Sequence, residues 1–414
     1  MSIVSKELDG LIHQIASRDG GAAPDGSYAS HPLLARLKAL GSELWIDTGD
    51  LELARSIWKS DLTALTTNNT LANQVVQSGV MDQVIEETVR KVREHSSELS
   101  QQEMVREIGF VINCRIALRL VEAFQVKVSV ELHPAMARDL EKSLIYGRRY
   151  FRVCPEFFTV KVPLTPEGLL AVRKLRRENI PINFTLGFSA RQNYLAARLA
   201  NPNFVNVFLG RLNQVVIDND LGSGDLVGEQ VTLATQRVLI RLRKEHPEVK
   251  SRLIGASIRN GEQLACLAGV DVLTIPPKAM KEFLESGKNA QDVNSRLEET
   301  LNPGVKPEGW GLKCKDLWEV PEAFAESVEE LMRSPDLDDF TGGRLVEFFE
   351  KKEIPLFHRF SPADLSAIQD HGKIPRLSAW PDSTALDDLM TQSALQSFSK
   401  DQDALDARIA SFLK

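Results

Sequence analysis

The chain has 414 residues, which is enough for one large barrel or for two to three ordinary domains with a substantial core. Its hydrophobic content of 43% and charged content of 26% are typical of a soluble globular protein, and its net charge of -7 gives no support for a nucleic-acid partner. The first residues lack the apolar core of a signal peptide, and no apolar run reaches about twenty residues, so we expect a cytoplasmic protein with no membrane partner.

The amino-terminal region predicts helices. An amphipathic pattern predicts a helix over residues 3–18, and a second short helix is predicted over residues 33–40. The stretch between them, residues 20–30, is rich in glycine, alanine, proline and serine and predicts a flexible connection. We therefore treat residues 1–41 as a helical extension.

The next region alternates short apolar segments with amphipathic patterns, which is typical of a parallel α/β fold. Eight repeats over roughly 230 residues favour a closed (β/α)8 TIM barrel over an open doubly wound sheet, and we assign residues 42–285 to it. Helices are predicted at residues 81–95, 103–124, 167–178, 230–246 and 278–285. The predicted strands are residues 44–47, 64–68, 127–132, 158–163, 182–188, 205–210, 252–257 and 272–275.

The composition changes after the eighth repeat. Residues 286–382 contain many prolines, glycines and charges, with short helical patterns at residues 322–333 and 344–351. That is long for one barrel connection, so we predict an appended, mostly helical insertion. Residues 383–414 form the last segment, in which a clear helical pattern returns.

The predicted fourth strand places Lys161 inside an apolar, β-branched run. Lysine is almost never fully buried without a partner. In a poorly solvated site its pKa falls, which leaves a neutral amine that can attack a carbonyl. Taken alone, the segment favours a simpler interpretation, in which the lysine lies at a strand end and its ammonium group reaches solvent or a carboxylate.

Strand alternation favours the catalytic interpretation. Alternate residues of a strand face opposite sides of the sheet, and six successive strands direct polar groups to one side. Barrel interiors are normally filled by branched aliphatic side chains, and a buried polar set without function is costly. Each residue alone is more typical of structure than of catalysis, but together they predict an active site. They are Asp47, Thr66, Asn68, Ser129, Glu131, Lys161, Asn183, Thr185 and Asn206, with Phe208 on the same face.

These residue types indicate the chemistry of a class I aldolase. A neutral lysine forms an imine with a ketone, two carboxylates transfer protons, and amides and hydroxyls hold a polyhydroxylated chain. After the sixth and seventh strands come Arg211, Ser257 and Arg259, which suit a sugar phosphate because guanidinium groups bind phosphate in a bidentate manner. For either arginine alone, a surface salt bridge is the alternative.

The cysteines and histidines do not predict a metal centre. The seven histidines have no metal-binding spacing, and the four cysteines lie far apart, which predicts reduced thiols. The cysteines are Cys114, Cys154, Cys266 and Cys314.

Seven motifs resemble, in order, those of the transaldolase family. The resemblance covers about residues 42–285 and returns at residues 397–402 and Leu405, which are similar to the family's closing helix; residues 286–382 have no counterpart that we can match. The motifs are Asp47-Thr48-Gly49-Asp50, Thr66-Thr67-Asn68, Val128-Ser129-Val130-Glu131, Val160-Lys161-Val162-Pro163, Ile182-Asn183-Phe184-Thr185-Leu186, Phe208-Leu209-Gly210-Arg211 and Gly255-Ala256-Ser257-Ile258-Arg259-Asn260.

The resemblance implies a transferase without metal or organic cofactor that acts on sugar phosphates of the pentose phosphate pathway. It would move a dihydroxyacetone unit from sedoheptulose 7-phosphate or fructose 6-phosphate to an aldose phosphate. By similarity, Lys161 forms a Schiff base with the donor C2 carbonyl. Asp47 takes the proton of the C4 hydroxyl, and Glu131 and Thr185 hold a water that shuttles protons.

The resemblance also assigns substrate contacts. Asn68 and Asn183 would hold the dihydroxyacetone hydroxyls, and the phosphate would bind at Arg211, Ser257 and Arg259.

Two positions bear on specificity. Phe208 stands where the transferases have phenylalanine and the related fructose 6-phosphate aldolases have tyrosine, which favours transfer. Asn206 replaces a serine that the family usually carries near the C1 end of the donor.

Two alternatives stay open at this point. One keeps the chemistry but uses another donor or acceptor in a specialised sugar pathway, because Asn206 and the insertion alter the pocket. The other is a non-catalytic barrel that acts as a binding or scaffold protein, against which the intact Lys161, Asp47 and Glu131 argue. A barrel of this kind can also form a homodimer through its helices, and the sequence does not identify which.

Overall fold

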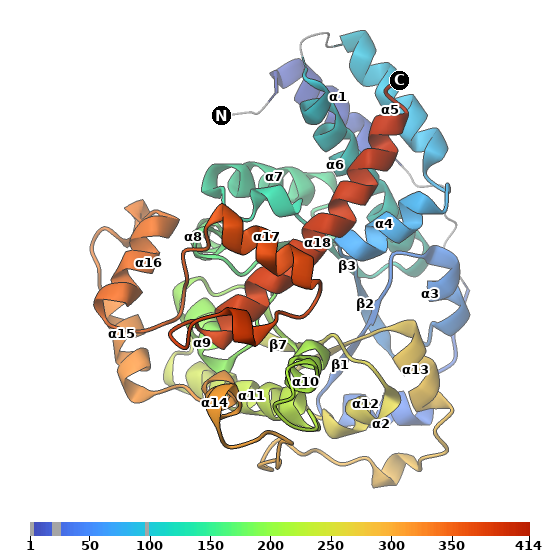
Figure 1. Cartoon of the computed structure of the whole chain (residues 1–414). Helices are drawn as coiled ribbons and strands as arrows, with labels where there is room; N and C mark the ends of the chain where they lie inside the picture. Colours follow the sequence, from blue (N-terminus) through green and yellow to red (C-terminus); the bar gives the residue numbers. More distant parts are fainter. Residues whose placement is uncertain (1–3, 19–25, 96–98) are drawn as a thin grey trace.

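The computed structural model describes residues 4–18, 26–95 and 99–414. Eight parallel strands close into a barrel in which each strand pairs with the next and β8 pairs with β1 (Figure 1). The predicted (β/α)8 TIM barrel is thereby confirmed. The strands are β1 (Glu43–Asp47), β2 (Leu62–Thr66), β3 (Lys127–Glu131), β4 (Phe158–Pro163), β5 (Ile182–Thr185), β6 (Phe204–Phe208), β7 (Arg252–Ala256) and β8 (Val272–Ile275).

Helices form the outer layer because one face of each is apolar and packs on the strands. A Thr165 side chain that accepts a hydrogen bond from Gly168 N, with Pro166 at the first helical position, begins α8 directly after β4. The barrel helices are α3 (Leu51–Ile57), α4 (Asn69–Gln77), α5 (Asp82–His95), α6 (Gln101–Phe124), α7 (Leu140–Val153), α8 (Pro166–Arg177), α9 (Ala190–Leu199), α10 (Leu209–Asp218), α11 (Val227–Glu245), α12 (Gly261–Cys266) and α13 (Pro277–Leu284), with a 3-10 turn η1 (Pro134–Met136) before α7.

Five strands, β2, β3, β5, β6 and β7, end one to three residues earlier than their apolar patterns predict, and the ends of β5 and β6 bear on the site. β5 ends at Thr185 because Leu186 takes a left-handed conformation with φ 67°, which breaks the extended backbone. β6 ends at Phe208 because α10 starts at the next residue, so Arg211 lies in the first turn of a helix. Both changes occur at the carboxyl ends of the strands.

The amino-terminal helices precede the barrel. The predicted helices appear as α1 (Lys6–Ala16) and α2 (Pro32–Ala39), each within a residue or a few residues of its expected ends. The predicted connection falls largely on residues 19–25, which lie outside the described residues.

The insertion winds around one side of the barrel (Figure 1). α15 (Glu322–Met332) packs on α9 and α16 (Gly342–Lys351) packs on α8, and these two are the helices that the sequence predicted. The Arg198 and Glu329 side chains join α9 to α15 at 2.6 Å. The sequence pattern did not predict α14 (Gly309–Lys313) or α17 (Pro362–His371). In α17 only Ile368 is buried, so the apolar stripe of this helix is weak. The 3-10 turns of the region are η2 (Ala290–Asp292), η3 (Cys314–Leu317), η4 (Leu337–Asp339) and η5 (Leu377–Ala379).

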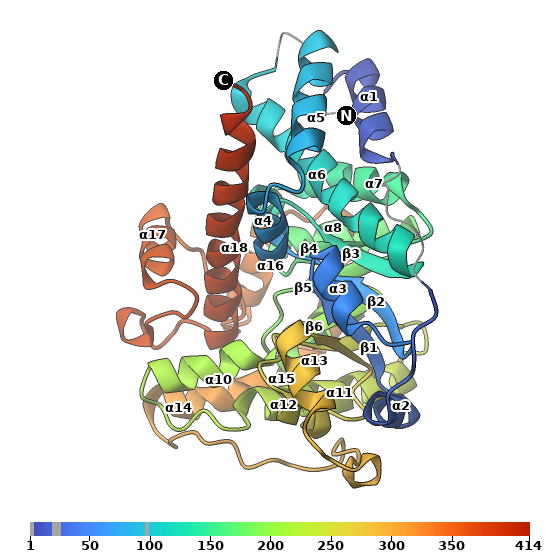
Figure 2. The same cartoon turned by 90° about the vertical axis from the view of Figure 1, so that its right-hand side faces the viewer.

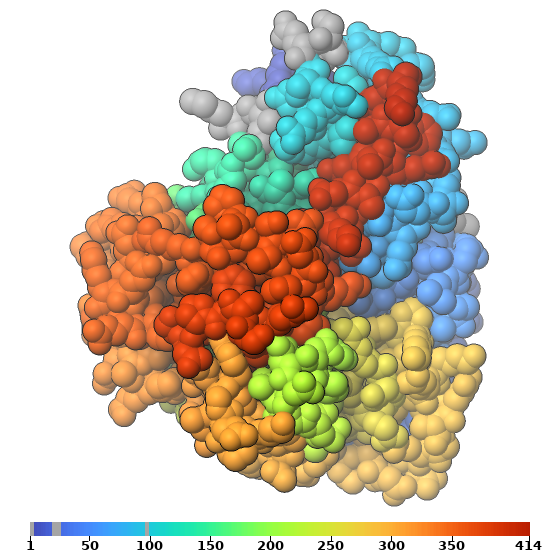
Figure 3. Space-filling model, in the orientation of Figure 1, coloured from blue at the N-terminus to red at the C-terminus, as the bar shows by residue number. Residues whose placement is uncertain are grey.

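The last helix, α18 (Leu386–Ser411), crosses in front of the barrel and runs beside α4 in both views (Figures 1 and 2). Asn69 Nδ2 donates to Gln402 Oε1 at 2.9 Å, and the Thr70 hydroxyl donates to Asp401. α18 and the insertion together cover much of this face of the molecule (Figure 3). Across the described ranges, no helix is both long and apolar enough to cross a membrane.

The buried start of α18 makes stability depend on pH. Burial raises the pKa of Asp388 to about 7 from its ordinary 3.8, against the opposing effect of the His358 N–H, which donates to Asp388 at 2.6 Å. A raised pKa gives stability that is complete below the unfolded value and is lost as the pH rises to the folded value. We expect this group alone to reduce the free energy of unfolding by roughly 3 to 4 kcal/mol between pH 4 and pH 7.

Urea unfolding of the wild type and of Asp388→Asn at pH 4.5 and pH 7.5 measures this effect. The variant should gain stability relative to the wild type at the higher pH, since its amide does not ionise. Asp370→Asn, at an exposed carboxylate of α17, is the control and should show no such difference. A difference between Asp388→Asn and the wild type that stays constant with pH would contradict the assignment.

Candidate active site

A cavity of about 210 Å3 opens at the carboxyl ends of the strands. In a TIM barrel this end carries the catalytic residues. Eight of the eleven site residues predicted from the sequence line the cavity: Asp47, Asn68, Lys161, Asn206, Phe208, Arg211, Ser257 and Arg259. The other three, Glu131, Asn183 and Thr185, are buried in the barrel interior.

Lys161 lies inside the barrel. Its side chain is 5% exposed, and its Nζ lies 3.1 Å from Glu131 Oε2 and donates to the Thr67 carbonyl at 3.2 Å. Strand register explains the pairing, since Glu131 of β3 and Asn183 of β5 both stand opposite Lys161 of β4. The interpretation of a lysine that reaches solvent is therefore wrong; the carboxylate partner is present, but within the barrel.

Asp47 ends β1 beside a pair of threonines. Its Oδ1 accepts from Thr66 Oγ1 at 2.6 Å, and Thr66 Oγ1 lies 2.6 Å from Thr274 Oγ1 of β8. Burial raises the pKa of Asp47, and the positive charge of Lys161 opposes that rise. A carboxyl group whose pKa moves toward neutrality is suited to both taking and returning a proton.

Glu131 is the second carboxyl group at Lys161. Burial raises its pKa, the charge of Lys161 opposes the rise, and the charge of Asp47 adds to it. Glu131 Oε1 and Thr185 Oγ1 are buried and have no hydrogen-bond partner among the described residues. Buried polar atoms are normally hydrogen-bonded, so these two atoms, in the barrel interior beside Lys161, are suited to binding water.

A chain of amides lines the floor of the site. Asn206 Nδ2 donates to Asn183 Oδ1 at 2.7 Å and to the Phe184 carbonyl at 3.1 Å, and Asn183 Nδ2 donates to Ser129 Oγ at 3.1 Å. Each amide is thereby held in one orientation. Asn206, the departure from the family pattern, thus has its amide nitrogen engaged by protein.

Arg211, in the first turn of α10, and Arg259, in the loop between β7 and α12, approach each other at the cavity. Gly210 allows this approach, because a Cβ there would lie 2.3 Å from the Ser257 carbonyl oxygen and 2.6 Å from Arg259 Nε. Burial lowers the pKa of Arg211 to about 10, with a further contribution from the charge of Arg259. Arg259 is exposed, and partial loss of hydration lowers its pKa as well. Two cations held together against their mutual repulsion are suited to a dianionic ligand.

Asn68 has a structural contact besides its place on the cavity wall. Its Oδ1 accepts from Leu71 N at 2.9 Å and caps the start of α4, which leaves the amide nitrogen as the group available to a ligand. Asn68 therefore both caps α4 and lines the cavity.

Among the cavity residues that were not predicted as site residues are Thr274, Lys373 and Phe398. Thr274 stands between Leu273 and Ile275, and the alternation that identified the other strands would have found it. Lys373 and Phe398 come from the insertion and from α18. Arg211 Nη1 donates to the Lys373 carbonyl at 3.0 Å, and the Arg211 guanidinium lies 5.7 Å from the Phe398 ring centroid. No pattern within either segment signals these contacts.

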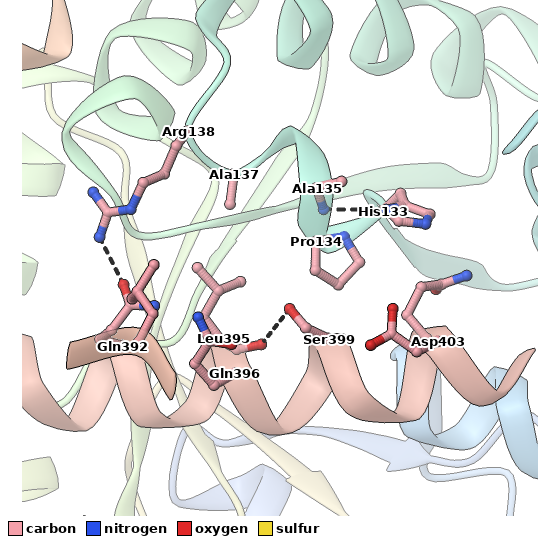
Figure 4. A pocket seen from close by; sticks show the side chains of 12 residues that line it. His133, Pro134, Ala135, Ala137, Arg138, Gln392, Leu395, Gln396, Ser399 and Asp403 are labelled. Atoms are coloured by element: carbon pink, nitrogen blue, oxygen red, sulfur yellow. Dashed lines mark hydrogen bonds between the residues drawn. The ribbon is translucent and has the colours of Figure 1, made fainter. Parts of the chain in front are cut away.

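A second cavity lies outside the barrel, between the β3–α7 connection and α18 (Figure 4). At one end His133 Nδ1 accepts from Ala135 N at 3.1 Å, and at the other Arg138 Nη2 donates to Gln392 Oε1 at 2.7 Å. His133 Nε2 also lies 3.0 Å from Asp406 Oδ2 of α18. The histidine is therefore a loop residue that joins the barrel to α18.

Comparison with known proteins identifies a family for the barrel and the first part of the insertion. The model of a family described as Transaldolase/Fructose-6-phosphate aldolase matches residues 44–333. This match extends past residue 285 into the insertion, farther than the motifs alone indicated.

Curated relatives agree with the family match. A transaldolase of Xanthomonas euvesicatoria is 28% identical over 266 residues, which are 62% of this chain and 79% of the relative. A probable transaldolase of Thermus thermophilus is 31% identical, over 59% of this chain and 91% of the relative. A probable transaldolase of Exiguobacterium sibiricum is 36% identical, over 42% of this chain and 72% of the relative.

Proposed function

This chain belongs to the transaldolase/fructose-6-phosphate aldolase family, and we propose that it transfers a dihydroxyacetone unit between sugar phosphates through a Schiff base on Lys161. The donor is fructose 6-phosphate or sedoheptulose 7-phosphate, and the acceptor is an aldose phosphate of the pentose phosphate pathway in the cytoplasm. The observation that carries the proposal is Lys161 itself, buried on a cavity wall within 3.1 Å of Glu131 Oε2.

Imine formation is the first step. The Lys161 amine, after its ammonium group has given up a proton, attacks the C2 carbonyl of the donor, and loss of water gives the Schiff base. Glu131 takes and returns protons through a water held with the Thr185 hydroxyl, for which the unpartnered Glu131 Oε1 and Thr185 Oγ1 are suited.

Cleavage of the carbon–carbon bond follows. Asp47 takes the proton of the C4 hydroxyl, and C4 with its oxygen becomes the aldehyde group of the leaving aldose. The electrons of the C3–C4 bond move into the iminium to give an enamine. The shortened aldose leaves, C3 of the enamine attacks the acceptor aldehyde, and Asp47 returns its proton to the new hydroxyl. Hydrolysis of the imine then frees the product and Lys161.

Asn68 and Asn183 hold the hydroxyls of the three-carbon unit during this exchange. Asn183 is oriented by Ser129 and Asn206, so its position does not depend on the substrate. Holding the enamine in one orientation keeps its C3 directed at the acceptor.

The substrate phosphate binds at Arg211, Ser257 and Arg259. We expect Arg259→Ala to raise KM for fructose 6-phosphate by about tenfold or more, because a charge-assisted contact with phosphate is lost. Steady-state kinetics with fructose 6-phosphate and with unphosphorylated fructose measure this. Arg333→Ala, at an exposed arginine of the insertion, is the control, and an equal effect of Arg259→Ala on both sugars would contradict a phosphate role.

A two-substrate assay tests the proposed function. Fructose 6-phosphate and erythrose 4-phosphate should give sedoheptulose 7-phosphate and glyceraldehyde 3-phosphate, whereas simple aldol cleavage would release free dihydroxyacetone without an acceptor. Phe208 on the cavity wall supports transfer.

Asn206 supports a second candidate, the same chemistry with another donor. Its amide nitrogen already donates to Asn183 and to the Phe184 carbonyl, so it meets the C1 end of a donor differently from a serine. Comparison of kcat/KM across ketose phosphates distinguishes the two candidates.

A further inference from the structure

The insertion reaches the cavity through one segment, residues 372–377, that lies against α10. Asn219, the C-cap residue of α10, donates through Nδ2 to the Pro375 carbonyl at 3.1 Å. Its Oδ1 accepts from Leu377 N at 2.8 Å. At the other end of the segment the Lys373 carbonyl accepts from Arg211 Nη1 at 3.0 Å. The insertion, in orange, meets the yellow-green region of α10 on this face of the molecule (Figure 3). Hydrogen bonds at both ends therefore fix the segment at the cavity.

Among the residues that the structure describes, none is a partner of the Lys373 side chain. It is exposed and lines the cavity, and within the described ranges its ammonium group makes no hydrogen bond or ion pair. Two other lysines of the insertion are engaged: Lys306 donates to the Asp220 carbonyl at 2.8 Å, and Lys352 lies 2.5 Å from Glu330. Within the described ranges, what distinguishes Lys373 is that its unengaged side chain lines the same cavity as the buried Arg211.

The charges around Lys373 favour an anion. Arg211 and Arg259 line the same cavity, and the carboxylate that interacts with Arg211, Asp401, already accepts a hydrogen bond from Thr70. Asp47 interacts with Arg259 and Lys161 at the inner end. At the outer end positive charge is therefore in excess, which attracts an anionic substrate.

We propose that Lys373 is a specificity-determining residue of the active site, whose ammonium group binds the phosphate of a sugar phosphate beside Arg211 and Arg259. The inference rests on the proposed function, since it takes the substrate to be phosphorylated. A phosphate monoester carries close to two negative charges at neutral pH, and an ammonium group offers three donors to its oxygens. The anchored backbone sets the distance between this cation and Lys161, and hence the sugar length that spans them.

Binding of inorganic phosphate tests this without relying on turnover. Isothermal titration calorimetry of the full chain should show the Kd for phosphate rising about three- to tenfold in Lys373→Gln, which removes the charge but keeps a polar side chain and the backbone carbonyl that holds Arg211. Lys373→Glu should weaken binding further, and Lys373→Arg should restore it. Lys351→Gln, at an exposed lysine of α16, is the matched control and should bind phosphate as the wild type does.

The kinetic prediction is a rise in KM for fructose 6-phosphate in Lys373→Gln, with kcat and the KM for unphosphorylated fructose unchanged. Equal phosphate affinity in Lys373→Gln and the wild type, with Arg259→Ala weakened, would overturn the role of Lys373 and leave the proposed function standing. Absence of phosphate binding by the folded wild type would also overturn it. Failure of the proposed function appears separately, as the absence of a trapped adduct on Lys161.

Discussion

Replacing Lys161 by methionine removes transfer activity, with an expected loss in kcat/KM of about 10^4-fold or more. Methionine is about as long as lysine and keeps its apolar stem, so the barrel interior stays filled. It has no amine that could form the imine. The remaining partner, Glu131, is buried and can take a proton in place of the lost ion pair. The two-substrate assay measures the loss, and circular dichroism with thermal unfolding checks that the fold is retained.

Lys127→Met is the matched control. Lys127 begins β3 at the opposite end of the barrel, where it is exposed, and its loss should leave transfer unchanged. Turnover by a folded Lys161→Met variant at the wild-type rate would rule out the Schiff base.

Replacing Asp47 by asparagine should reduce kcat by about 10^2- to 10^4-fold, because the amide takes no proton from the C4 hydroxyl. The hydrogen bond from Thr66 is retained, since an amide oxygen also accepts. Imine formation does not need that proton transfer, so the variant should accumulate the imine of the intact donor. Borohydride reduction followed by mass spectrometry should find the whole sugar phosphate on Lys161, where the wild type also carries the three-carbon unit.

Asp50→Asn is the control for that variant. Asp50 follows the same strand but is exposed and caps α3, where Asp50 Oδ1 accepts from Leu53 N at 3.0 Å. Its replacement should affect stability more than kcat. A three-carbon adduct in Asp47→Asn, formed as fast as in the wild type, would assign the proton transfer to another group.

Strand alternation predicted the interior of the site because a closed parallel barrel has one inside and one outside. The register bears this out for Glu131, Lys161 and Asn183, which stand side by side on β3, β4 and β5. The same alternation on β8 pointed to Thr274, which was overlooked because a single threonine among apolar residues suggests no chemistry.

The contribution of the insertion could not be predicted from the sequence. Lys373 lies 162 residues after Arg211 in the chain, and only the folded path of the insertion brings its carbonyl within 3.0 Å of the guanidinium. The strand ends were missed for a local reason, since the left-handed Leu186 interrupts an apolar pattern that continues in the sequence. Apolar periodicity describes which face is buried and carries no information on either feature.

The scaffold alternative predicts no reaction at this site. It requires a barrel that keeps a buried Lys161 and Glu131 pair, an Asp47 with a raised pKa and two cations at the mouth without using them. Membership in the transaldolase/fructose-6-phosphate aldolase family favours catalysis instead.

Trapping the covalent intermediate tests the central claim most directly. The wild-type chain is incubated with fructose 6-phosphate and sodium borohydride, digested and analysed by mass spectrometry. We predict a reduced adduct on the peptide that contains Lys161, absent in Lys161→Met. No adduct with any ketose phosphate, or an adduct confined to another lysine, would contradict a Schiff base at Lys161.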